Sequence, residues 1–267
     1  MKGQGATLSR RPPSGSDAPG GAEIAANHRR ALLLAALPAL VVFAAGVGIA
    51  GVLVSVVVGL VVGAVAGAVA GSVAWWGGAA AAVRLTGARV AGVDEEPRLH
   101  NLIDGLCAAS GIPKPTLRVV DDDVPNALTV GHHPRRTTIV VTSGLVSSLG
   151  PIELEAVLAH ELSHVKAHDV LPGTVAVTSL GAVAVLFAPA ARLPFWGAGD
   201  QREPLADLAA VALTRYPPGL IAALEKIAAG PRGAGHSQRA RARATAHLWI
   251  RSQGSSLDER LQALREL

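Results

Sequence analysis

The chain has a single cysteine and few aromatic residues among its 267 residues. A lone Cys107 excludes a disulfide within the chain and fits a reducing compartment, so we expect it to be a small core residue. Phe, Trp and Tyr together make up 3% of the sequence. Because aromatic rings are so scarce, few can lie beside the basic residues of the chain, and this limits the partners that those residues could bind.

Five arginines near the C-terminus carry much of the positive charge. They are Arg232, Arg239, Arg241, Arg243 and Arg251. Only Trp249 lies among them, whereas a nucleic-acid face interleaves basic residues with aromatic rings. We therefore expect no nucleic-acid partner. Attraction to anionic lipid headgroups explains the cluster better, and a solvated loop over residues 230–238 is equally compatible with it.

Charge is missing altogether from residues 31–83. One membrane-spanning helix needs only about 20 apolar residues, so this run is long enough for two. We predict a transmembrane helical hairpin over this run, with spans near 31–54 and 58–82 and a turn around Ser55. Half of all residues in the chain are hydrophobic, as expected of a protein whose partner is a lipid bilayer.

Small residues recur at intervals of four in the second predicted span. They are Gly59, Gly63, Gly67 and Gly71. Such a stripe lets two helix backbones approach closely in lipid. We expect it to pack against the first span, and a homodimer contact is the alternative. Trp75 and Trp76 near the end of the span fit an anchor at the membrane interface.

Basic residues flank the predicted hairpin on both sides. They are Lys2, Arg10, Arg11, Arg29 and Arg30 before it, and Arg84 and Arg89 after it. Because positive loops stay in the cytoplasm, we predict a multi-pass protein of the cell (inner) membrane whose C-terminal part faces the cytoplasm. We expect the first span to be an uncleaved anchor. Residues 1–30, with Gly, Pro and Ser throughout, are predicted to be a disordered tail.

The most informative motif is the string His-Glu-Leu-Ser-His at residues 160–164. It lies in an apolar run with helical spacing, which places His160 and His164 one above the other on one helix face. This is the separation that one zinc ion needs, and Glu161 lies where it can accept a proton from a metal-bound water. The motif predicts a zinc site in which Glu161 is the catalytic base.

A catalytic zinc usually has three protein ligands and one open position. Glu203 is the candidate third ligand, and Asp207 lies four residues further on, on the same face of a helix. We expect Asp207 to hydrogen-bond the distal nitrogen of a zinc-bound histidine and to fix its orientation. The alternative is a solvated acidic helix face.

These motifs together resemble the HtpX-type membrane metalloproteases of metallopeptidase family 48, which also holds the CAAX prenyl proteases. The similar segments are residues 125–127, 142–145, 153–166, 202–227 and 257–261, and the resemblance covers about residues 94–267. It implies an α+β, mostly helical fold in which the hairpin is joined to a zincin-like metalloprotease domain with a small β-sheet over residues 84–267. It also implies one Zn²⁺ per chain, held by His160, His164 and Glu203.

The chain departs from the family pattern in several places. The family usually has Thr-His-Pro before its last helix, where this chain has Ser-Gln-Gly-Ser at 252–255. Pro204 replaces an aromatic residue and suits the first turn of a helix, so Glu203 should lie at a helix start. His168 stands where Asn is common, and it should be a second-shell or surface residue. His247 could stabilise the transition state, although a packed or surface histidine is the simpler reading.

A third apolar run, residues 170–196, needs a separate account. It is long enough to cross a bilayer once, yet a single crossing would separate His164 from Glu203. We therefore expect the run to be re-entrant or to be buried in the soluble part of the protein.

The region between the hairpin and the zinc motif has mixed patterns. Helical spacing is present over residues 95–110, and β-branched residues at 116–120 and 137–142 predict strands. The resemblance implies a small sheet to which the substrate adds as a further strand, with Asn126 and Ala127 as substrate-binding residues. The alternative for Asn126 is an ordinary turn. His132 and His133, between Gly and Pro, are interpreted as loop residues.

The sequence therefore predicts a membrane-anchored zinc-dependent metalloendopeptidase. The resemblance implies protein or peptide substrates, among them damaged or misfolded membrane proteins in quality control. Three alternatives remain at this stage. They are a non-catalytic membrane scaffold that keeps the zinc-protease fold, a signalling protease that cuts one regulator, and, with less support, a prenyl-protein protease.

Overall fold

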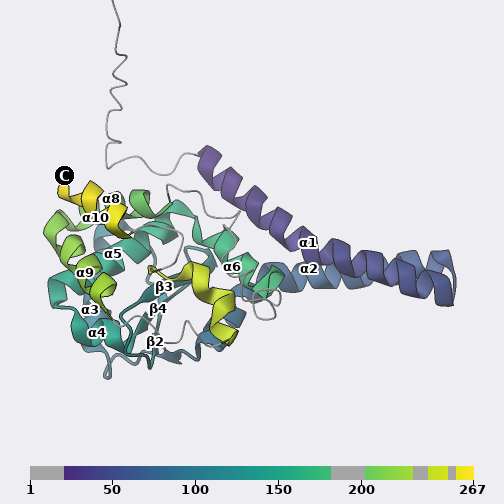
Figure 1. Cartoon of the computed structure of the whole chain (residues 1–267), viewed down its shortest axis with the longest axis horizontal. Helices are drawn as coiled ribbons and strands as arrows, with labels where there is room; N and C mark the ends of the chain where they lie inside the picture. The colour runs from purple at the N-terminus through teal and green to yellow at the C-terminus, as the bar shows by residue number, and fades with distance from the viewer. Residues whose placement is uncertain (1–20, 182–201, 231–239, 252–256) are drawn as a thin grey trace, which may run out of the picture.

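The computed structural model describes residues 21–181, 202–230, 240–251 and 257–267. A long hairpin of two helices projects from a body of helices and one small sheet (Figure 1). The helices are α1 (Gly21–Leu53), α2 (Val56–Thr86), α3 (Pro97–Ser110), α4 (Ser143–Ser148), α5 (Pro151–Ala167), α6 (Val170–Ser179), α8 (Arg202–Thr214), α9 (Pro217–Ala229), the 3₁₀ helix η3 (Ala240–Leu248) and α10 (Leu257–Arg265). The predicted fold class, α+β and mostly helical with a small sheet, is confirmed.

The sheet has four strands, β1 (Arg89–Val90), β2 (Thr116–Val120), β3 (Ala127–His133) and β4 (Arg136–Thr142). Their order is β1-β2-β4-β3, in which β2 and β4 are parallel and the other two pairs are antiparallel. β3 is therefore an edge strand.

The hairpin turns where the sequence predicts. Ser55 caps the start of α2, because its side chain accepts a hydrogen bond from the Val58 backbone N–H at 3.3 Å. Both helices are long and apolar enough to cross a membrane, and only 6% and 17% of their most apolar windows are buried. Their outer faces therefore suit lipid, and the chain is a membrane protein.

Residues 21–30 differ from the predicted disordered tail, because α1 already begins at Gly21. This segment is rich in Ala, the best helix former, and carries Glu23 in the first turn, where a negative charge suits the helix dipole. Charged residues such as Arg29 and Arg30 mark where a helix leaves lipid, but the helix itself can continue past them. Residues 1–20 lie outside the described residues.

The glycine stripe of α2 packs against α1, as predicted. A Cβ atom on Gly63 would lie 2.7 Å from the Phe43 carbonyl oxygen, and one on Gly67 would lie 2.8 Å from that of Ala39. Because these distances are shorter than van der Waals contact, the helices can approach this closely only with glycine there. The stripe is thus occupied within one chain, and a homodimer stays a prediction.

Helix α6 holds the first part of the third apolar run, and most of its residues are buried. Its Thr178 hydroxyl donates to the Ala74 carbonyl of α2 at 2.6 Å, and Thr174 Oγ1 accepts from the Gly131 N–H of β3 at 3.0 Å. Ten residues are too few to cross a bilayer. This part of the run is therefore buried between the hairpin and the sheet, and residues 182–196 lie outside the described residues.

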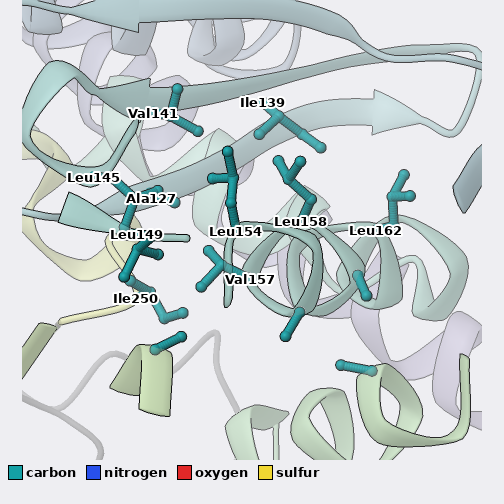
Figure 2. Packing of buried hydrophobic residues seen from close by; sticks show 14 of the residues in the cluster. Ala127, Ile139, Val141, Leu145, Leu149, Leu154, Val157, Leu158, Leu162 and Ile250 are labelled. Atoms are coloured by element: carbon teal, nitrogen blue, oxygen red, sulfur yellow. The ribbon is translucent and has the colours of Figure 1, made fainter. Parts of the chain in front are cut away.

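Helix α5 lies between the sheet and the helices α8 and α9 (Figure 1). Leu154, Leu158 and Leu162, spaced four apart, lie between α5 and strand β4, which carries Ile139 and Val141 (Figure 2). All five side chains are fully buried. This packing fixes how α5 is rotated, and so decides which of its side chains face α8.

The sequence patterns located α3, β2 and β4, but they did not predict β3 as a strand. His132 and His133 lie at the end of β3, so their assignment to a loop was wrong. Gly131 looks like a turn residue in the sequence, but its role is close approach: a Cβ there would lie 2.6 Å from the Arg136 carbonyl oxygen. A β-bulge between Gly131 and His133 accompanies this contact.

Candidate metal centre

Helix α5 brings the residues of the His-Glu-Leu-Ser-His motif to one place. His160, Glu161 and His164 are each at most 2% exposed. The two histidines lie one turn apart, and their Nε2 atoms are 3.2 Å from each other. The two ring planes are perpendicular, with centroids 4.7 Å apart.

Helix α8 brings Glu203 to the same point from a distant part of the sequence. Glu203 lies in the first turn of α8, beside Pro204, where a proline is compatible with a helix. One carboxylate oxygen is 3.4 Å from His160 Nε2, and the other is 3.5 Å from His164 Nε2. The three residues form what we call the His–His–Glu group, whose ligand atoms all lie within 4.8 Å of one another.

The geometry of this group fits one tetrahedral metal ion. Ligand atoms at about 2.0–2.1 Å from a tetrahedral Zn²⁺ are about 3.3 Å apart. The two Nε2 atoms are 3.2 Å apart, and the Glu203 carboxylate approaches them with one oxygen each, Oε2 at 3.4 Å from His160 and Oε1 at 3.5 Å from His164. In addition, Glu203 Oε2 is buried and accepts no hydrogen bond of regular geometry from the described residues, although Arg260 Nη1 lies 3.2 Å from it. Two imidazole nitrogens and one carboxylate are a donor set that zinc commonly takes.

Two carboxylates hold the outer nitrogens of the histidines. His160 Nδ1 lies 2.8 Å from Asp207 Oδ1, and His164 Nδ1 lies 3.0 Å from Asp169 Oδ2. Each carboxylate favours a proton on the nitrogen that it contacts, which leaves Nε2 of each ring as the atom available to a metal ion. Such an arrangement of acceptors attracts a cation.

The charge state of His160 reflects this attraction. Burial disfavours its charged form, but the contacts with Asp207 and Glu203 outweigh that effect and raise the pKa of His160 to about 9. Burial also disfavours the ionised Glu203, yet the positive field of His164 and the contact with His160 hold the pKa of Glu203 well below its usual range. The His–His–Glu group thus combines an ionised Glu203 carboxylate with surroundings that favour positive charge on His160.

Asp169 was not predicted as a partner of His164, and the reason is local. Residues five apart do not share a face of a regular helix. Here α5 ends at Ala167, its C-cap residue His168 has a φ of 54° in the left-handed region, and the chain turns back so that Asp169 meets the His164 ring. The sequence offers no pattern for this turn, since His168 is neither Gly nor Asn.

Two arginines, the buried Arg260 and the partly buried Arg202, complete the surroundings of the group. Arg260 of α10 binds both oxygens of Asp207, each at 2.7 Å, and its Nη1 lies 3.2 Å from Glu203. Arg202 lies 3.4 Å from Asp169 and 3.5 Å from Glu203. Neither was predicted as a site residue, although Arg260 belongs to the C-terminal segment that resembles the family. Together they offset the negative charge of three clustered carboxylates.

The predicted base, Glu161, points toward the edge strand. Its Oε2 accepts a hydrogen bond from the Thr129 hydroxyl of β3 at 2.5 Å. Glu161 thus lies on the same helix as the two histidines, and its carboxylate is held by a residue on another element.

Asn126 and Ala127 lie at the start of β3, where the C-terminal segment covers them. The Asn126 side chain accepts from the Arg251 backbone N–H at 3.1 Å, and the Ala127 carbonyl accepts from the Ile250 N–H at 2.9 Å. Both residues are buried, and among the described residues no hydrogen bond or ion pair joins either to the His–His–Glu group. Their role in substrate binding stays a prediction.

The other histidines lie around the site. His247 Nε2 donates to the Gly173 carbonyl at 2.9 Å, and burial lowers the pKa of His247 to about 4, so it is a neutral, packed residue at neutral pH. His168 caps α5, and its ring lies 5.8 Å from that of His133. We find no contact of either His168 or His133 with the predicted ligands' side chains in the described part of the chain.

Asp169→Asn is expected to weaken zinc binding by about 10- to 100-fold, because it removes the carboxylate that orients His164. Titration of the metal-free full-length protein with Zn²⁺ against a chelating dye measures this affinity. Asp104→Asn is the matched control, since Asp104 pairs with Lys114 on the surface. Wild-type affinity in Asp169→Asn would refute the orienting role.

Comparison with known proteins places the chain among peptidases. The family model described as peptidase family M48 matches residues 94–267. A protease HtpX homolog of Dictyoglomus turgidum is 37% identical over 54% of this chain and 58% of its own length. Another, from Tropheryma whipplei, is 31% identical over 63% of this chain and 68% of its own. This chain thus spans less than two thirds of the first of these relatives, and no solved structure matches it.

Proposed function

Because the chain belongs to peptidase family M48, we propose that it is a membrane-anchored zinc metalloendopeptidase that hydrolyses peptide bonds of proteins. One observation carries the proposal: His160, His164 and Glu203 each offer a ligand atom within 4.8 Å of the others, close enough to share a single ion. Members of this family are metalloproteases. Zinc is the metal that best suits this donor set with one position left open.

The residues of the chain divide the chemistry among them. When bound, Zn²⁺ would polarise the scissile carbonyl and make water acidic enough to attack at neutral pH. Glu161 accepts the proton of the attacking water and later delivers it to the nitrogen of the leaving amine, so the carboxylate is regenerated. Asp207 and Asp169 orient the two imidazoles, and Arg260 keeps Asp207 in place.

We further propose that the substrates are damaged or misfolded membrane proteins and that the metal site faces the cytoplasm. Two features support a site near the bilayer on the cytoplasmic side. The hairpin fixes the site close to a bilayer, because α6 contacts both the hairpin and the sheet. Arg29 and Arg30 precede the first apolar span and Arg84 follows the second, which favours the cytoplasmic side for both ends.

Metal removal tests the proposal directly. The full-length protein, purified in detergent or nanodiscs, should lose hydrolysis of an unfolded protein such as casein after treatment with a chelator. One equivalent of Zn²⁺ per chain should restore it, because one His–His–Glu group lies among the described residues. The rate of peptide release and the metal content per chain are measured together. Hydrolysis that persists in verified metal-free protein would contradict the proposed function.

A further inference from the structure

Thr129 is the one described residue that donates a hydrogen bond to the predicted base. Its Oγ1 lies 2.5 Å from Glu161 Oε2, within hydrogen-bonding distance. Thr129 is 1% exposed and Glu161 is 2% exposed, so water does not compete for this contact at the surface. We propose that Thr129 is a positioning residue for Glu161. This inference rests on the proposed function.

The contact assigns different tasks to the two oxygens of Glu161. Oε2 is committed to the Thr129 hydroxyl, and no donor among the described residues contacts Oε1. Oε1 is therefore the oxygen left to accept the proton of the attacking water and to return it to the leaving nitrogen. A carboxylate free to rotate would present either oxygen in many orientations, and few of these would be productive.

The nearby charges do not supply this orientation. Arg202 and Arg260 act on Glu161 through space, but neither forms an ion pair with it within the described residues. Their guanidinium groups contact Glu203 and the two orienting aspartates instead. The direction of the Glu161 side chain is thus set by its helix and by Thr129.

Strand β3 makes Thr129 a well-fixed donor. Thr is β-branched, so its χ1 angle has few choices in a strand, and its backbone is paired with Ile139 of β4. The hydroxyl direction therefore follows from the position of β3. The sheet packs on one side of α5 and holds the proposed base through Thr129. Helix α8 packs on the other side of α5 and supplies the proposed third ligand, Glu203.

The test compares Thr129→Val, which keeps the shape and removes the hydroxyl, with Thr129→Ser, which keeps the hydroxyl. Thr129→Val should lower kcat about 10-fold with KM and zinc content unchanged, because only the orientation of the base is lost. Thr129→Ser should stay within about threefold of wild type, since Oγ can still donate. The full-length protein is assayed with one quenched peptide over a range of concentrations.

Thr137→Val is the matched control. Thr137 is a buried threonine of the neighbouring strand, and its hydroxyl donates to the His133 carbonyl rather than to the site. Its kcat should equal that of wild type. If Thr129→Val does not fold, the pair Thr129→Ala and Thr129→Ser gives the same comparison, with melting temperature as the measure of folding.

The inference is overturned if Thr129→Val keeps the wild-type kcat, or if its lost activity is matched by lost zinc or a raised KM. It is also overturned if Thr129→Ser is as impaired as Thr129→Val, because a packing role would then explain both. Failure of the proposed function gives a different result. In that case Glu161→Gln and wild type would be equally active, whatever Thr129 does.

Discussion

Glu161→Gln is expected to abolish proteolysis while leaving the metal in place. The amide has nearly the shape of the carboxylate and can still accept the Thr129 hydrogen bond, but it cannot take up the proton of the attacking water. General-base catalysis contributes about 10²- to 10⁴-fold, so kcat should fall by that factor. The three ligand side chains are untouched, and zinc content measured on the same sample should remain one per chain.

Glu155→Gln is the matched control for this experiment. Glu155 lies on the same helix, but it is partly exposed and is not one of the residues of the His–His–Glu group. Its kcat should match that of wild type. Equal activity of Glu161→Gln and wild type would defeat the enzyme assignment, and the chain would then be a membrane scaffold that keeps the metal group.

The second large effect is expected from Glu203→Gln, which should lose both metal and activity. An amide is a far poorer zinc ligand than a carboxylate, and two histidines alone leave the ion with half of its usual coordination. We expect the affinity for Zn²⁺ to fall more than about 100-fold, beyond the effect of removing an orienting carboxylate. Activity at limiting zinc should fall with it.

Equilibrium dialysis against buffered Zn²⁺, with metal content and peptide hydrolysis followed on the same samples, measures this change. Glu225→Gln serves as its control, because Glu225 is a surface residue of α9 paired with Arg265. Zinc binding at wild-type strength in Glu203→Gln would show that a different residue completes the site. It would not affect the role of Glu161, so the two predictions can fail separately.

The hairpin and helix α5 could be predicted from the sequence because their signals are local. Absence of charge over residues 31–83 is a property of one continuous segment, and so is the spacing of His160 and His164. The candidate third ligand lies some forty positions further along the chain, and the family resemblance supported the choice of Glu203. The structure brings these residues together, while their function as ligands still awaits the metal measurements.

The parts that were missed depend on contacts between distant segments. β3 was not recognised because Gly131 and Pro134 resemble turn residues, and its strand is defined by pairing with β4. Asp169 reaches His164 only because α5 ends in a left-handed residue. Arg202 looks like an ordinary charged residue at a helix start, and its burial against two carboxylates has no local signal.

Helix α6 has a consequence for how the hairpin and the metal site move. Its Leu171 and Val175 pack with Ala31 of α1 and Ala74 of α2, while its Thr174 holds Gly131 of β3. The depth at which the two apolar helices sit therefore sets the height of the edge strand above the lipid. Any shift of the hairpin would therefore carry β3 and Thr129 with it.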